Sequence, residues 1–116
     1  DAWEALPLFA SQRALPPAAQ AQQRAARLAH DALALAWAFE VAGLACMPDL
    51  RPAVAAAQQP LVFLTGALDT RFAALGASLE RPPWVRHRSV PGAGHNLLLE
   101  APAAVAASLA DLMEQQ

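Results

Sequence analysis

Residues 60–69 read PLVFLTGALD, and this stretch decides the fold class. The apolar run Leu61–Leu64 is continuous rather than alternating, which is typical of a strand covered on both faces in a parallel sheet. Gly66 permits a sharp turn out of that strand, and a helix is predicted from Thr70 to Leu79. Residues 84–90, WVRHRSV, predict a second strand, and residues 102–114 predict a last helix. The order strand–helix–strand–helix implies an α/β protein with parallel strands and a right-handed crossover.

The segment before residue 58 predicts helices. After Pro17 the chain has no proline before Pro48, and it consists mainly of alanine, leucine, glutamine and arginine, which favour helix. Asp31 is suited to cap a second helix, so we expect one break near His30. Residues 49–54 predict a short helix with Asp49 as its N-cap.

Composition excludes several classes of function. The 116 residues carry a net charge of −2 with no basic run, which argues against binding to nucleic acid. No apolar run approaches the roughly 18 residues of a membrane span, and no signal-peptide pattern is present. Cys46 is the single cysteine and has no ligand-type spacing around it, so no disulfide, metal or cofactor is expected, and a reducing cytoplasm fits best.

Two polar side chains follow the two predicted strands. Asp69 comes just after the first strand, and His95 follows the second within the glycine-rich turn GAGHN, residues 92–96. Because functional groups of open α/β sheets gather beyond the carboxyl ends of the strands, we expect these side chains to meet. A carboxylate that holds the imidazole Nδ1–H lets Nε2 act as a base. The alternative is that Asp69 only caps the following helix.

The order of these residues matches the serine–acid–histidine triad of one scaffold, in which the serine comes first in a G-x-S-x-G elbow. None of the serines has that context; they are Ser11, Ser78, Ser89 and Ser108. The chain also begins with Asp1 rather than methionine. We therefore expect a fragment whose nucleophile and oxyanion hole lie upstream.

Two motif blocks carry a resemblance to known enzymes. Residues 66–69 (GALD), and residues 91–96 (PGAGHN) with 100–102 (EAP), resemble the last blocks of α/β-hydrolases. The upstream part, with Trp3, residues 7–9, Arg27 and residues 35–51, resembles the lid of the 2-succinyl-6-hydroxy-2,4-cyclohexadiene-1-carboxylate synthases. These enzymes of menaquinone biosynthesis eliminate pyruvate from their substrate. The resemblance covers nearly the whole chain, aligned to the C-terminal half of that family.

The resemblance implies roles and a domain division. Residues 1–57 would form lid or cap helices, and residues 58–116 would form the C-terminal portion of the hydrolase core. Asp69 and His95 would be catalytic, Arg27 would bind a substrate carboxylate through its planar fork, and Trp3 would line the pocket. Without the resemblance, Arg27 is interpreted as a solvated helix residue and Trp3 as a packing residue. His30 and His87 are interpreted as surface or packing residues.

Three functions stay open at this stage. The leading hypothesis is the lyase, acting on a small carboxylate substrate. An ester or thioester hydrolase of the same fold would share Asp69 and His95 without needing Arg27. An inactive fragment or interaction module is the third, because two strands of a larger sheet leave an edge that pairs with another chain. We expect such pairing with the missing N-terminal half or with a second copy.

Overall fold

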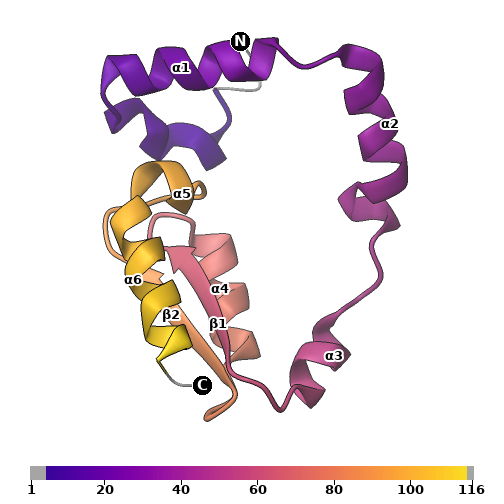
Figure 1. The fold of residues 1–116 in the computed structure, drawn as a ribbon, viewed down its shortest axis with the longest axis vertical. Coiled ribbons are helices and arrows are strands. Elements are labelled where there is room, and N and C mark those ends of the chain that lie inside the picture. Colours follow the sequence, from indigo (N-terminus) through magenta and orange to yellow (C-terminus); the bar gives the residue numbers. More distant parts are fainter. Residues whose placement is uncertain (1–4, 115–116) are drawn as a thin grey trace. The chain divides into compact units, whose positions relative to one another are not determined.

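The computed structural model describes residues 5–114, so Trp3 lies outside the described residues. In order along the chain, the elements are η1 (Pro7–Ala14), α1 (Pro17–Leu28), α2 (Ala32–Ala42), η2 (Leu44–Cys46), α3 (Arg51–Ala56), β1 (Leu61–Gly66), α4 (Thr70–Leu79), β2 (Val85–Val90), α5 (Leu97–Glu100) and α6 (Pro102–Met113), with η for a 3-10 helix (Figure 1).

The chain divides into two compact units, which are described separately. One consists of residues 15–50, and the other combines residues 5–14 with residues 51–114. This division by compactness differs from the expected boundary between residues 57 and 58, because η1 and α3 group with the strands. The assignment of a lid and a core stays a prediction.

The strands β1 and β2 are parallel, as predicted. Their register runs from Leu61 opposite Val85 to Gly66 opposite Val90. Both strands therefore end at the same edge of the sheet, and the loops that follow them emerge side by side. The predicted bounds of α4 are confirmed. The strand β1 begins at Leu61 as predicted but extends two residues beyond the apolar run, to Gly66, and β2 begins at Val85 rather than at residue 84.

Helices cover both faces of this two-stranded sheet, α4 on one and α6 on the other (Figure 1). On the α4 face, Gly76 brings the helix backbone against the side chains of Phe63 and His87. On the other face, Arg88 of β2 pairs with Asp111 of α6 at 2.6 Å. The continuous apolar character of β1 follows from this cover on both faces.

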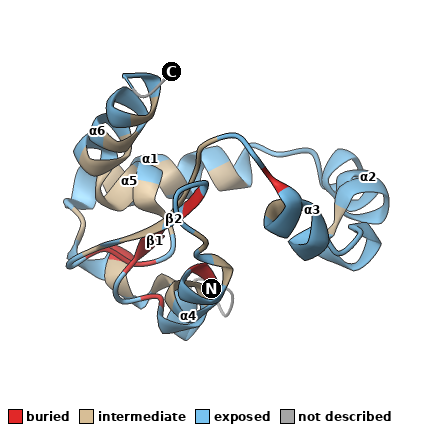
Figure 2. Cartoon of the chain, turned by 90° about the horizontal axis from the view of Figure 1, so that it is seen from below, coloured by how far each residue is buried: buried red, intermediate tan, exposed pale blue. Residues whose placement is uncertain are grey.

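The unit of residues 15–50 holds α1, α2 and η2. The predicted break near His30 is confirmed, and the Asp31 side chain caps α2 by accepting a hydrogen bond from Ala34 N at 2.8 Å. Most of α2 is exposed, including Trp37 and Phe39 at 65% and 67% (Figure 2). No single helix among residues 5–114 is long and apolar enough to cross a membrane. One pair of consecutive helices in that range, α1 and residues 32–46, has the necessary length and apolar composition together, but it is bent by 84°.

Three short elements were not expected, and one of them is η2, which follows the end of α2. The 3-10 helix η1 begins at Pro7 and is too short to show a helical period in its sequence. The single turn α5 follows His95 directly, where residues 97–99 are all leucine and give no periodic signal. The helix α3 begins at Arg51, two residues after Asp49.

Candidate active site

Asp69 stands at the end of the loop that leaves β1, where it also caps α4. Its Oδ1 accepts a hydrogen bond from Phe72 N at 3.2 Å, which satisfies one free amide at the start of the helix. The residue is only 7% exposed. Capping uses one carboxylate oxygen and leaves Oδ2 available to a second partner.

His95 supplies that partner from the loop after β2. Its Nδ1 lies 2.6 Å from Asp69 Oδ2, and since an ionised carboxylate only accepts, the imidazole donates. The ring of Phe72 packs against the imidazole with centroids 5.0 Å apart. The expected contact between Asp69 and His95 is therefore present. It is compatible with the capping alternative, because Oδ1 accepts from the helix amide while Oδ2 accepts from His95.

The two loops are joined through their backbones as well as through this pair. Ala67 N donates to Val90 O, and Leu68 N donates to Ala93 O, each at 2.9 Å. A Cβ at Gly66 would stand 2.6 Å from the carbonyl carbon of Ala93 and closer still to neighbouring carbonyl oxygens. Only glycine at this position lets the loops approach so closely.

The carboxylate of Glu100 holds the segment around His95. Glu100 Oε2 accepts from Gly94 N at 2.6 Å, and Oε1 accepts from Asn96 N at 3.1 Å. The Asn96 side chain in turn caps α5 by accepting from Leu99 N at 3.3 Å. The sequence motif included Glu100, but its role was missed, because contacts between a side chain and a nearby backbone amide leave no periodic signal in a sequence.

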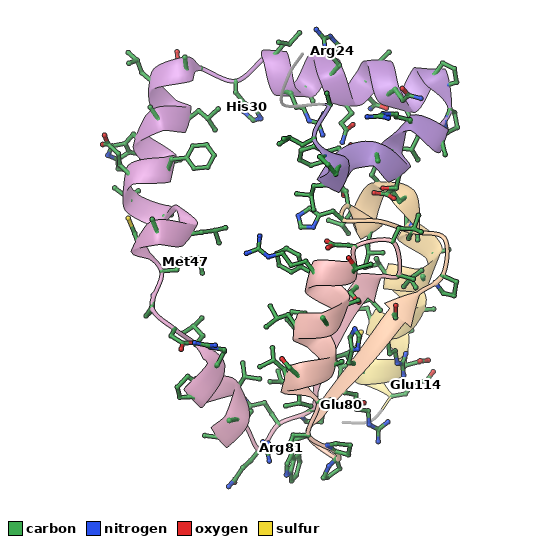
Figure 3. All side chains as sticks on the ribbon, turned by 180° about the vertical axis from the view of Figure 1, so that it is seen from behind. Arg24, His30, Met47, Glu80, Arg81 and Glu114 are labelled. Atoms are coloured by element: carbon green, nitrogen blue, oxygen red, sulfur yellow. The ribbon has the colours of Figure 1, made fainter. Side chains whose placement is uncertain are left out.

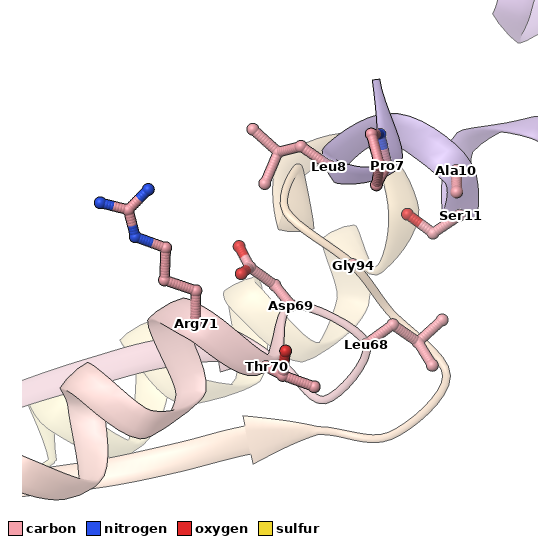
Figure 4. Close-up of a pocket in the computed structure, with 9 residues that line it drawn as sticks. All are labelled: Pro7, Leu8, Ala10, Ser11, Leu68, Asp69, Thr70, Arg71 and Gly94. Atoms are coloured by element: carbon pink, nitrogen blue, oxygen red, sulfur yellow. The ribbon is translucent and has the colours of Figure 1, made fainter. Parts of the chain in front are cut away.

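A cavity of about 440 Å³ opens beside Asp69. Figure 4 shows the Asp69 carboxylate pointing toward Leu8, while the Arg71 side chain extends from the start of α4. The lining residues are Pro7, Leu8, Ala10, Ser11, Leu68, Asp69, Thr70, Arg71 and Gly94. The cavity is mostly apolar with a few polar groups, which is typical of a site for a small molecule.

The serines of the chain do not supply a nucleophile elbow among the described residues. Ser11 lies in η1, Ser78 in α4, Ser89 in β2 and Ser108 in α6. Ser11 lines the cavity and sits directly against the Cα of Gly94, and its buried Oγ has no hydrogen-bond partner within residues 5–114. None of these positions is the strand-to-helix turn that exposes a catalytic serine.

The other predicted residues lie elsewhere. Arg27 is half-buried in the last turn of α1, within the unit of residues 15–50, and its contact with a substrate stays a prediction, as does that of Trp3. His30 is exposed in the turn between α1 and α2 (Figure 3). His87 packs under α4 and lies 2.8 Å from Thr65 Oγ1, which fits the packing role.

This geometry is compatible with the predicted role of His95 in proton transfer. Asp69 fixes Nδ1, and the His95 side chain is still 35% exposed, so Nε2 can reach a reacting group. A buried carboxylate that orients a partly exposed imidazole is the arrangement that a triad requires of its acid and its histidine, and the catalytic roles of Asp69 and His95 stay predictions.

Comparison with known proteins identifies relatives of this arrangement. No family model matches the chain. A 2-succinyl-6-hydroxy-2,4-cyclohexadiene-1-carboxylate synthase from Enterobacter sp. (strain 638) is 35% identical over 97% of the chain, and one from Escherichia coli O7:K1 is 36% identical over 96%. MenH from S. aureus, an α/β-hydrolase fold, superposes with a TM-score of 0.90 at 27% identity, covering 98% of this chain and 43% of that one.

The chain spans about 41% of the length of the curated relatives that it matches. It is homologous to that part of them, and its fold is the corresponding part of an α/β-hydrolase fold. The predicted fold class and the predicted resemblance are confirmed.

Proposed function

We propose that the full-length protein is a 2-succinyl-6-hydroxy-2,4-cyclohexadiene-1-carboxylate synthase, a lyase of menaquinone biosynthesis that eliminates pyruvate. The 2.6 Å bond between Asp69 and His95 at the carboxyl ends of two parallel strands supports a triad enzyme of this fold, whether lyase or hydrolase. The observation that favours the lyase is the match to relatives that carry the synthase name. Relatives with that printed name match nearly the whole chain and so support the same reaction.

Asp69 and His95 serve as two members of a triad whose serine lies outside these 116 residues. The Nδ1–H of His95 is held by Asp69, so the lone pair of Nε2 is directed at the serine hydroxyl. The serine oxygen, once deprotonated, removes a proton from the substrate ring. The electron pair left by that proton forms a new double bond in the ring, the bond from the ring to the enolpyruvyl oxygen breaks, and the imidazolium returns its proton to that oxygen as enolpyruvate leaves.

The substrate side of the proposal rests on other residues. A ring substrate with carboxylate groups matches a bidentate arginine, and Arg27 is the residue assigned to that contact. Trp3 would line the pocket. The chain alone is expected to be inactive because it lacks the elbow serine, and association with the N-terminal half or with a second copy would cover its sheet edge.

The test is an assay of pyruvate release by the full-length protein from the succinyl-cyclohexadiene precursor. We expect pyruvate and the cyclohexadiene product to form together, and the His95→Ala variant to form neither at a comparable rate. Cleavage of activated esters or thioesters without any release of pyruvate would overturn the lyase and favour the hydrolase alternative.

A further inference from the structure

The backbone amides on both sides of His95 donate hydrogen bonds to one carboxylate, that of Glu100. Gly94 N donates to Glu100 Oε2 at 2.6 Å, and Asn96 N donates to Glu100 Oε1 at 3.1 Å. His95 is the residue between these two amides. Both oxygens of Glu100 are thus engaged by the backbone that flanks the imidazole.

A single helical turn brings Glu100 into this position. In α5, Glu100 N donates to Asn96 O at 2.8 Å, and Ala101 N donates to Leu97 O at 2.9 Å. This turn folds the Glu100 side chain back over the loop that precedes it. Glu100 is half-buried, so its hydrogen bonds are shielded in part from competing water.

Before His95, the loop is held against the β1 side by the bond from Leu68 N to Ala93 O at 2.9 Å, and Ala93 is buried. That bond lies two residues before His95 and does not reach the two amides that flank the imidazole, which Glu100 binds. The bond from His95 to Asp69 nevertheless requires the imidazole to be held within about 0.5 Å of its place. A restraint on the backbone at both neighbours of His95 meets that requirement.

We propose that Glu100 is a positioning residue that locks the His95 loop and so maintains the bond between His95 and Asp69. Glu100 acts through the backbone and does not touch the imidazole in any contact of the described residues. The inference rests on the proposed function for its kinetic readout, whereas a spectroscopic readout of the His95–Asp69 bond is independent of the reaction.

The experiment compares Glu100→Gln and Glu100→Ala with the matched control Asp111→Asn in the full-length protein. Asp111 is also a carboxylate near the C-terminus, but it pairs with Arg88 on the surface, away from the His95 loop. Glutamine keeps the shape of Glu100 and one acceptor oxygen, while its amide group turns a donor toward a backbone N–H. Alanine removes both acceptors.

The first readout is the proton resonance of the His95 Nδ1–H in protein labelled with ¹⁵N-histidine. A strong hydrogen bond to a carboxylate moves this resonance far downfield, and the His95→Ala variant identifies it. We expect the resonance to move upfield and to exchange faster with water in Glu100→Gln, and to disappear in Glu100→Ala. Asp111→Asn should leave it in place.

The second readout is the split between kcat and KM. Loss of positioning should lower kcat by roughly 10- to 100-fold in Glu100→Ala, less in Glu100→Gln, with little change in KM. A role in stability alone would lower the melting temperature and leave both the resonance and the kcat of the folded protein unchanged, and that result would overturn the proposal.

The outcomes separate this inference from the proposed function. If Glu100→Ala fails to fold, the resonance and the kcat of Glu100→Gln decide whether Glu100 positions His95. A wild-type resonance that is downfield and indifferent to Glu100 refutes the positioning role alone. A wild-type protein with the Glu100-dependent resonance but no release of pyruvate supports the positioning role and contradicts the lyase.

Discussion

Replacing Gly66 with alanine should separate the two loops that carry Asp69 and His95. The added Cβ would stand 2.6 Å from the carbonyl carbon of Ala93, and real Cβ atoms essentially never come within 3.0 Å of such atoms. The gap between 2.6 Å and 3.0 Å requires the backbone at residue 66 and at Ala93 to move apart by at least about 0.4 Å, and clearing the nearby carbonyl oxygens requires more. Because these are backbone atoms, no side-chain rotation relieves the clash.

The displacement acts directly on the hydrogen bond between Asp69 and His95. The 2.6 Å bond between Asp69 and His95 spans the same gap as the bond from Leu68 N to Ala93 O. We expect overpacking to cost about 1–3 kcal/mol of unfolding free energy. Since a misplacement of 1 Å costs about 100-fold in rate, kcat should fall by roughly 10- to 100-fold.

Gly92→Ala is the matched control in the same site. A Cβ at Gly92 would meet nothing within 4 Å, so its cost is the backbone strain of a φ of +72°, about 1–2 kcal/mol. Urea unfolding and pyruvate release by the full-length protein should show similar losses of stability in the two variants. A much lower kcat is expected only in Gly66→Ala, and equal kcat values in the two variants would refute the reasoning.

Three further changes test other parts of the account. His95→Ala should lower turnover by about 10⁴-fold in the pyruvate assay, and near-normal turnover would contradict its role as a base. Gly76→Ala places a Cβ 2.7 Å from Nε2 of His87, so urea unfolding should show a loss of about 1–3 kcal/mol despite the gain in helix propensity, and a more stable variant would refute the close contact. Asp31→Ala removes the cap of α2 and should cost about 1 kcal/mol by the same measurement, with Asp31→Asn as the control that retains it.

The sequence predicted the parts of the fold that depend on continuous burial and on the glycines, prolines and capping residues that end helices and strands. The apolar run of β1 and the helix after Asp69 were found because they are continuous and clearly bounded. The pairing of Asp69 with His95 followed from parallel strands ending at one edge. These inferences needed only the order of the elements.

The parts that the sequence did not predict depend on short-range backbone geometry. The short helices η1 and α5 have too few residues to show a periodic pattern. The contacts of Glu100 depend on the turn of α5, because that turn places the carboxylate beside two amides. Arg27 and Trp3 were assigned from the resemblance alone, because no local pattern of charge or hydropathy in the sequence distinguishes them from solvated or packing residues.

Asp69→Asn tests most directly whether the carboxylate works as a triad member or only as a cap. Asparagine caps helices as well as aspartate does, so α4 should keep its bond to Phe72 N and the unfolding free energy should change by less than about 1 kcal/mol. The amide lacks the charge that orients and stabilises the His95 imidazolium, so pyruvate release should fall on the order of 10⁴-fold. Turnover that stays near the wild-type rate in a fully folded variant would contradict the role of Asp69 in catalysis.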